Sequence, residues 1–323
     1  MLEALAHYKI LGRIGIGRMG ELYRARDTRA GRTVALRVVA DEIAAELERR
    51  QRFLRDARAA AALSHPNIAA LYEIGEDQER LFLVSEFVPG DTLRTLTSGR
   101  PLNLRHALDH GIQLADALAE GHAAGLLHQD IEPRNIIITP KGIAKFIDFG
   151  LGAWTASGAE RQRITSVAGD NAGSADAVAY MAPEQVLGLP VDERSDVFSL
   201  GVVLFEMFVG TPPPLVPAAP GALTAEVLQS PPPPPSALNS TLPRELDAIV
   251  LKMLARSLNG RYGSAATVAA ELRSVGALLD VRESAAEPPP ITVVASRRRG
   301  VGLWILIVLA AIGVVTALAF YVW

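Results

Sequence analysis

The sequence predicts an α+β protein of two lobes, the first rich in β-strands and the second helical, followed by a single C-terminal helix. Three observations predict this. Residues 8–26, 33–40, 71–74 and 81–84 hold short runs rich in apolar residues, a pattern typical of strands. Residues 104–126 follow a helical pattern. Residues 301–323 carry no charge, which predicts a long apolar helix.

Composition limits the classes of function. The chain has 323 residues, a net charge of −3 and a pI near 6.1, so it lacks the basic field with which proteins hold nucleic acid. It contains no cysteine, which excludes disulfides, cysteine-ligated zinc and thiol catalysis. We therefore expect no nucleic-acid partner, and the absence of cysteine suits a reducing cytoplasm.

A glycine-rich hairpin is predicted near the N-terminus. Tyr8–Arg26 alternates as a strand, a turn and a second strand do, and Gly15, Gly17 and Gly20 form G-x-G-x-x-G at the turn. Glycines let backbone amides close over phosphates without obstruction by side chains. Dinucleotide-binding folds share the motif but begin a helix at the third glycine, whereas residues 21–26 continue as a strand. The pattern therefore favours a hairpin.

An arginine lies in the middle of the next predicted strand. Thr33–Ala40 is apolar except for Arg37, and a charge within a buried strand requires a partner. A helical pattern follows over residues 42–63, and Asp56 lies among its charged residues. We expect an Arg37–Asp56 ion pair, which either contributes to a phosphate site or only holds the helix against the sheet.

Three polar residues near the middle of the chain have a spacing that suits one chemical centre. Asp130 lies within His128–Asn135, Asn135 follows five residues later, and Asp148 lies thirteen residues beyond that. This spacing allows one carboxylate to meet an acceptor hydroxyl while the amide and the second carboxylate hold a metal-bound nucleotide.

Later motifs extend the pattern. The stretches around these residues read H-x-D-x-x-x-x-N and D-F-G, and Ala182-Pro183-Glu184, Asp196 and Arg261 follow in that order. Together they resemble bacterial membrane-anchored, eukaryotic-like Ser/Thr protein kinases over residues 8–280. In that resemblance Asp196 accepts backbone hydrogen bonds from the loop at Asp130, and Arg261 pairs with Glu184. Small-molecule phosphotransferases share the first motif but lack the last three features, so they are the less favoured class.

The resemblance implies a bilobal protein-kinase fold, with a β-rich N-lobe at about residues 8–86 and a helical C-lobe at about 89–280. It implies ATP and Mg²⁺ as cofactors, and a protein substrate or signalling partner. It assigns Asp130 to the acceptor hydroxyl, Asn135 and Asp148 to Mg²⁺, and Arg134 to the catalytic residues. The ATP-binding residues that it implies are Ile14, Gly15, Gly17, Gly20, Leu22, Ala35, Arg37, Asp56, Glu86 and Val88.

Four positions depart from the family's pattern. Arg37 stands for a Lys, Glu132 for a Lys that contacts the γ-phosphate, Gln129 for an Arg that reads a phosphorylated activation segment, and Ala177 for a Thr that bonds to the catalytic loop. Arg134 either returns the missing positive charge or bridges to Glu132. Two hypotheses follow: a slow Ser/Thr kinase, or a pseudokinase that binds nucleotide and acts as a signalling scaffold.

The C-terminus predicts a membrane anchor. At about 1.5 Å per residue, residues 301–323 span the hydrocarbon core of about 30 Å. Aromatic residues lie near both ends, at Trp304, Tyr321 and Trp323, and Arg297–Arg299 precede the segment within a linker over 281–300. The positive-inside rule places the kinase-like domain in the cytoplasm. We expect a single-pass protein of the inner cell membrane.

Overall fold

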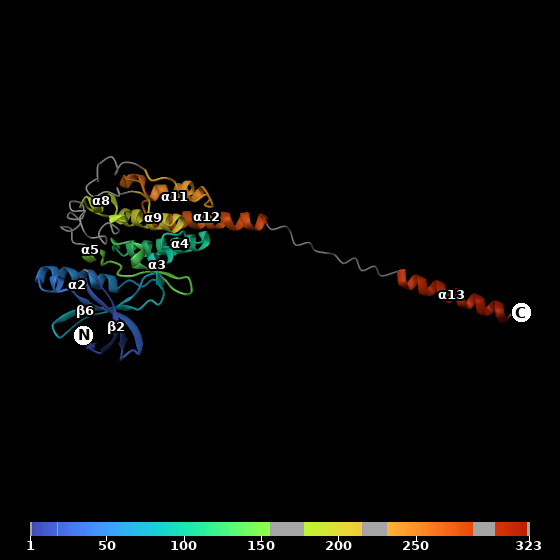
Figure 1. Cartoon of the computed structure of the whole chain (residues 1–323), viewed down its shortest axis with the longest axis horizontal. Coiled ribbons are helices and arrows are strands. Elements are labelled where there is room, and N and C mark those ends of the chain that lie inside the picture. Colours follow the sequence, from blue (N-terminus) through green and yellow to red (C-terminus); the bar gives the residue numbers. More distant parts are fainter. Residues whose placement is uncertain (1, 18, 156–177, 215–230, 287–300, 322–323) are drawn as a thin grey trace. The chain divides into compact units, whose positions relative to one another are not determined.

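The computed structural model describes residues 2–17, 19–155, 178–214, 231–286 and 301–321. The chain divides into two compact units, Met1–Leu279 and Asp280–Trp323. Within the first unit the N-terminal strands gather in one lobe together with α2 (Leu47–Ala61), and most of the other helices gather in a second lobe (Figure 1). The predicted order, strands before helices, is therefore the observed one.

The first lobe is built on a six-stranded antiparallel sheet in the spatial order β1-β2-β3-β4-β6-β5. Because side chains alternate across a strand, Phe82 and Val84 fill the core on one face of the sheet. Leu81 and Leu83 of the same strand belong to the core on the other face. The strands are β1 (Ala4–Leu5), β2 (Tyr8–Gly17), β3 (Gly20–Asp27), β4 (Arg32–Val39), β5 (Leu71–Asp77) and β6 (Arg80–Glu86).

Helix α2 (Leu47–Ala61) packs on the second of these faces. Its Phe53 and Ala57 share a core cluster with Leu83 and with Leu151 of the second lobe. The single helix expected over 42–63 is wrong in detail, because α1 (Asp41–Ala44) is separate from α2. Glu46 takes extended backbone angles between them, with φ −88° and ψ 122°, so the helical path is interrupted there.

A small three-stranded sheet, in the order β7-β8-β9, carries the loops that hold the predicted site. Asn67 fastens it to the first lobe, since its side chain donates to the Ala144 carbonyl at 2.8 Å and its own carbonyl accepts from the Phe146 N–H at 2.9 Å. The elements here are β7 (Asp91–Thr92), α3 (Leu93–Thr97), the 3₁₀ turn η1 (Pro133–Asn135), β8 (Ile136–Ile138) and β9 (Ala144–Phe146).

The second lobe packs around one buried helix, α9 (Glu193–Val209). This helix is buried continuously from Ser195 to Phe208, as a helix apolar on all sides should be. Helices α4 (Leu104–Ala123), α11 (Glu245–Met253) and α12 (Ala265–Ala286) contribute to the same core, and α4, α9 and α11 lie together in Figure 1. The shorter elements are α5 (Gly152–Thr155), α8 (Pro183–Val186), α10 (Pro235–Leu238) and η2 (Leu258–Gly260).

The second unit contains α13 (Val301–Tyr321), whose described side chains are those of residues 305–319. In the described part of the chain, no helix is both long and apolar enough to cross a membrane. The predicted span over 301–323 stays a prediction. Arg297–Arg299 lie outside the described residues.

Candidate active site

Asp130 and Asn135 are joined directly. Pro133 begins η1, and its fixed φ favours the tight turn that brings Asn135 back to Asp130. The Asn135 side-chain nitrogen donates to the Asp130 carbonyl at 2.9 Å and to Asp130 Oδ2 at 2.8 Å. The five-residue spacing therefore produces a turn in which the amide of Asn135 orients the carboxylate of Asp130.

Asp196 holds the loop on which Asp130 lies. Its carboxylate, almost fully buried on α9, accepts the backbone N–H of His128 at 2.7 Å and that of Gln129 at 2.8 Å. Gln129 has φ of 62°, in the left-handed region that a non-glycine residue seldom adopts without support. Gln185 adds a side-chain hydrogen bond to the Gln129 carbonyl at 2.9 Å. The predicted contact of Asp196 with this loop is confirmed.

His128 fastens the same loop to the apolar core. Its ring centroid lies 4.8 Å from that of Phe146 and 5.1 Å from that of Phe149, and its Nδ1 accepts the Asp130 N–H at 3.3 Å. Burial lowers the pKa of His128 below the ordinary 6.5. The imidazole is therefore neutral at pH 7 and serves as a structural acceptor.

Asp148 lies beside this turn because β8 and β9 are paired. Ile136 pairs with Phe146, and just outside the pair the Ile147 N–H donates to the Asn135 carbonyl at 3.0 Å. The residue after Ile147 is Asp148, which has φ of 57°. Asp130, Asn135 and Asp148 thus come together at one end of the small sheet, as their spacing in the sequence predicts.

The donors at this end suit a divalent cation. Asn135 and Asp148 offer hard oxygen ligands of the kind that Mg²⁺ takes. The Asp148 carboxylate already pairs with one cation, the Arg37 guanidinium, at a site where both side chains are mostly buried. Among the described residues no group of three or more His, Asp or Glu side chains could hold a metal.

The expected Arg37–Asp56 ion pair is wrong. Arg37 Nη2 pairs with Asp148 instead, and Asp56 Oδ2 accepts a hydrogen bond of 2.9 Å from the Trp154 indole Nε1. Trp154 lies on α5, and its ring packs edge-on against Phe53 of α2 with centroids 5.3 Å apart. Sequence reasoning missed Trp154, because a single aromatic residue after D-F-G carries no periodic or motif signal.

The glycine hairpin forms as expected from β2 and β3, and Gly17 pairs with Gly20 at its tip. Gly20 has φ of 115°, and a Cβ there would lie 1.9 Å from the Val38 carbonyl oxygen, so the fold itself requires glycine at this position. A Cβ at Gly15 or Gly17 would meet no described atom within 4 Å. The backbone at these two glycines is therefore open to a ligand that approaches closely, as phosphates do.

The other residues expected at the nucleotide site lie on the strands of the first lobe and just beyond them. Ile14 is exposed on β2, and Leu22 of β3 pairs with Arg37 of β4. Ala35 of β4 pairs with Ser85 of β6, and Val88 is buried after that strand. A cavity between the lobes is lined by Arg37, Ala60, Leu83, Ser85, Asp148 and Phe149, among others.

Glu86, at the end of β6, joins the two lobes by its side chain. Its carboxylate accepts from Lys145 Nζ of β9 at 2.8 Å and from the Ala70 N–H at 3.3 Å. Lys145 was not singled out from the sequence, where it is an ordinary strand cation. The contact fixes the start of the connector that is expected to meet adenine.

Glu132, one of the four departures from the family's pattern, contacts Arg134. Arg134 Nη2 and Nε donate to Glu132 Oε2 at 3.0 and 3.3 Å, so the bridging alternative is the one observed. The Arg134 side chain remains 47% exposed. The carboxylate of Glu132, which stands where the family has a Lys, thus partly offsets the positive charge of Arg134. Ala177 lies outside the described residues.

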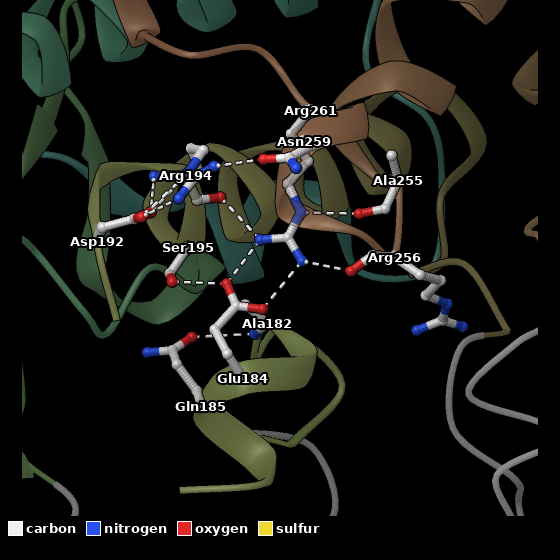
Figure 2. A network of polar contacts seen from close by, with 10 residues as sticks. All are labelled: Ala182, Glu184, Gln185, Asp192, Arg194, Ser195, Ala255, Arg256, Asn259 and Arg261. Atoms are coloured by element: carbon white, nitrogen blue, oxygen red, sulfur yellow. Dashed lines mark hydrogen bonds and ion pairs between the residues drawn. The ribbon is translucent and has the colours of Figure 1, made fainter. Parts of the chain in front are cut away.

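A second polar network holds the A-P-E segment, as Figure 2 shows. Arg261 Nη1 and Nη2 donate to the two carboxylate oxygens of Glu184 at 2.6 and 2.9 Å, which confirms the predicted pair. Ser195 Oγ donates to Glu184 at 2.6 Å. Burial raises the pKa of Glu184, but the hydrogen bonds from Arg261 and Ser195 outweigh it, so that the pKa lies below the ordinary 4.5. The network joins α8, the start of α9 and the turn before α12.

Two lobes, an open glycine hairpin, an Asp–Asn–Asp centre and a buried Glu–Arg pair together define the class of protein kinases. The family model described as the protein kinase domain matches residues 8–272. The chain belongs to this family.

Curated relatives are bacterial kinases. The chain is 38% identical over 258 residues to the probable serine/threonine-protein kinase SCO3848 of Streptomyces coelicolor. The match covers 78% of this chain and 37% of that protein. The chain is 37% identical over 283 residues to the serine/threonine-protein kinase PknB of Mycobacterium tuberculosis, which covers 85% and 42% respectively. The chain therefore spans about two fifths of the length of these relatives.

Solved structures give the same fold. The crystal structure of the Mycobacterium tuberculosis PknI kinase domain matches with a TM-score of 0.66 and 26% identity, over 86% of this chain and 99% of that one. The bilobal kinase fold, with a β-rich N-lobe and a helical C-lobe, is thus shared with it.

Proposed function

We propose that this chain is a Ser/Thr protein kinase that transfers the γ-phosphoryl group of ATP to hydroxyl groups of a protein substrate. The observation that carries the proposal is the contact of Asn135 with the Asp130 carboxylate at 2.8 Å, next to Asp148. The open backbone at Gly15 and Gly17 supports a phosphate ligand. The relatives named as serine/threonine kinases support the same class of acceptor.

The chain's own residues divide the work of transfer. Asp130 positions the acceptor hydroxyl and takes its proton, while the hydroxyl oxygen bonds to the γ-phosphorus and the bond from that phosphorus to the ADP oxygen breaks. Asn135 holds Asp130 in place through its side-chain amide. Asn135 and Asp148 would hold Mg²⁺, which neutralises phosphate charge when bound. Glu86 and Val88 mark the connector whose backbone would meet adenine.

We propose further that transfer is slow. Glu132 places a carboxylate two residues from Asp130, and Arg134 only partly offsets it. Arg37 pairs with the carboxylate that a metal needs. Loss of one preorganised charge contact typically lowers the rate about 10²- to 10³-fold, so two altered contacts place the chain well below an ordinary kinase.

The Arg37–Asp148 pair also favours a second candidate function, a pseudokinase that binds nucleotide and acts as a signalling scaffold. In this alternative the pair replaces the metal permanently, and the nucleotide serves to stabilise the fold for a protein partner. The two functions differ in one measurable respect, which is whether γ-phosphate is transferred.

The deciding experiment is incorporation of radiolabelled γ-phosphate by the full chain with ATP and Mg²⁺, into itself or a generic basic protein. Asp130→Asn should abolish incorporation, and Asp109→Asn, an exposed carboxylate on α4, is the matched control that should not. Wild type and Asp130→Asn both at background, together with a thermal shift on adding nucleotide, would instead favour the pseudokinase that binds nucleotide. Absence of both transfer and thermal shift would reject both functions.

Membrane attachment is the remaining part of the proposal. We place a single span at 301–323 and a linker at 281–300, with the kinase domain in the cytoplasm at the inner membrane. The described side chains of α13, residues 305–319, are exposed and almost wholly apolar. Exposure of such a surface is unfavourable in water and favourable in lipid. Deletion of residues 297–323 should move the protein from the membrane pellet to the supernatant. Continued sedimentation with membranes would reject the anchor.

A further inference from the structure

Trp154 connects α2 to the segment that follows Asp148. We propose that Trp154 is a positioning residue that weakens the binding of metal-bound nucleotide, because its hydrogen bond turns the Asp56 carboxylate toward α5 and away from Arg37, which leaves Arg37 on Asp148. This inference rests on the proposed nucleotide site. The indole N–H of Trp154 determines which carboxylate pairs with Arg37.

The position of Trp154 is fixed from three sides. Its indole N–H donates to Asp56 Oδ2 at 2.9 Å, its ring packs edge-on against Phe53, and the Arg52 guanidinium lies 5.8 Å from its ring centroid. The helix that carries it begins at Gly152, where a Cβ would lie 2.0 Å from the His128 carbonyl oxygen. Helix α5 is therefore packed tightly against the catalytic loop at one end and against α2 through Trp154.

The strand position of Arg37 faces the part of α2 that carries Asp56. Its backbone is fixed in the middle of the sheet, where it pairs with Leu22 on one side and Leu83 on the other. Leu83 packs in one cluster with Phe53 and Ala57, and Asp56 lies between those two residues on α2. Ala60, one helical turn beyond Asp56 on α2, lines the same cavity as Arg37 and Asp148. The inference is that the long side chain of Arg37 turns when its partner changes from Asp148 to Asp56.

The two pairings have opposite consequences for a metal. With Arg37 on Asp148, a divalent cation must displace a guanidinium from a mostly buried carboxylate, and separating such a pair leaves an uncompensated charge. With Arg37 on Asp56, Asp148 is free to bind the cation and Arg37 keeps a partner. The indole N–H stabilises the first arrangement because it holds Asp56 Oδ2, and so the orientation of that carboxylate, toward α5.

Binding of Mg²⁺·ADP to the full chain tests the proposal, with ADP in EDTA as the metal-free comparison. Trp154→Phe keeps an aromatic ring against Phe53 and removes only the N–H. This variant should bind Mg²⁺·ADP about tenfold more tightly, because a hydrogen bond to a charged group typically contributes about that factor. Its affinity for ADP in EDTA should be unchanged. Asp56→Asn can still accept the indole N–H but cannot neutralise Arg37, so Trp154→Phe in that background should give no gain.

Equal Mg²⁺·ADP affinity in wild type and Trp154→Phe, both with cooperative thermal unfolding, would overturn the proposal. So would an equal gain with and without Asp56→Asn, because the effect would then arise from packing alone. A gain that appears equally in EDTA would also overturn it, since the effect would not pass through the metal-binding carboxylate.

A second measurement needs no nucleotide and separates this inference from the proposed function. The chain has three tryptophans, so replacing Trp304 and Trp323 by Phe leaves Trp154 as the only indole reporter. In this background Asp148→Asn removes the partner of Arg37, which should turn to Asp56, displace the indole and shift Trp154 emission to longer wavelength. Adding Arg37→Ala should cancel the shift. Unchanged emission in Asp148→Asn would reject the exchange even if the chain binds nucleotide, and a shift would support it even if no nucleotide binds.

Discussion

Asp196 Oδ2 accepts the backbone N–H of His128 at 2.7 Å across 68 residues of sequence. The same oxygen lies 2.9 Å from His122 Nε2, and Oδ1 accepts the Gln129 N–H. One buried carboxylate on the central helix α9 therefore sets the backbone of the loop that carries Asp130. The stability of the C-lobe and the geometry of the active site depend on the same side chain.

Replacing Asp196 by Ala should lower the free energy of unfolding by about 3 kcal/mol or more, because two backbone N–H groups and one imidazole lose a buried acceptor. Urea unfolding followed by circular dichroism measures it. Asp192→Ala is the control on the same helix, where the carboxylate is an N-cap for Arg194 and is half exposed. Its cost should be about 1 kcal/mol, and an equal cost for both variants would contradict the role given to Asp196.

The sequence was sufficient for contacts that lie inside motifs. The convergence of Asp130, Asn135 and Asp148 follows from their spacing, and the Glu184–Arg261 and Asp196–His128 contacts follow from motif order. The direct hydrogen bond from Asn135 to Asp130 was not predicted, because the resemblance gave Asn135 to Mg²⁺. The partner of Arg37 was not predictable in this way. A guanidinium on a long side chain reaches more than one carboxylate, and the choice depends on where Trp154 packs against Phe53, which no spacing encodes. The break between α1 and α2 was missed because no Gly or Pro marks it.

Gly20→Ala and Gly17→Ala should separate a fold requirement from a ligand requirement. Gly20→Ala places a methyl group against the Val38 carbonyl at positive φ and should lower the free energy of unfolding by about 2 kcal/mol or more. Gly17→Ala meets open space, so the melting temperature should change little while nucleotide binding weakens. Thermal unfolding and an ADP titration of both variants check this, and a large loss of stability in Gly17→Ala would refute the distinction.

Arg261→Ala should be among the most destabilising substitutions of an arginine in this chain. It removes both hydrogen bonds to Glu184, along with those to the Ala255, Arg194 and Arg256 carbonyls, and it leaves a buried carboxylate unpaired at a cost of about 3–5 kcal/mol. Arg261→Lys should recover part of this, since an ammonium lacks the planar fork. Arg194→Ala, which also appears in Figure 2 but pairs at the surface with Asp192, should change stability little.

Stability should fall on mild acidification because of buried histidine. Burial lowers the pKa of His128 in the folded chain below the 6.5 of the unfolded chain. A depressed pKa gives stability that is complete above pH 6.5 and is lost as the pH falls toward the folded value, at up to about 1.4 kcal/mol per pH unit for one proton. Unfolding measured between pH 7.5 and 5.5 should show this slope, and His128→Phe should reduce it. His110 has the same direction by burial, so His110→Phe should account for a further part. Equal slopes in all three proteins would reject the assignment.

Glu132→Lys is the change that should raise kinase activity. The carboxylate of Glu132 accepts two hydrogen bonds from Arg134 and lies two residues from Asp130, where the acceptor and the γ-phosphate would meet. A lysine there removes the repulsion, adds a positive charge and releases Arg134, so the rate should rise by about 10²-fold, the effect of one preorganised charge contact. The radiolabel assay measures it, with Glu132→Gln, expected in between, separating loss of repulsion from gain of attraction.

Arg134→Ala tests the role of the arginine that bridges to Glu132. If Arg134 only neutralises Glu132, its removal should lower activity in wild type, where the carboxylate loses its partner, and should have no effect once Glu132 is Lys. If Arg134 itself faces the phosphate, its removal should lower activity equally in both backgrounds. The bridge seen in the structure favours the first result. An unchanged rate in Glu132→Lys, with intact unfolding behaviour and bound nucleotide, would show that the missing lysine is not what limits transfer and would favour the scaffold.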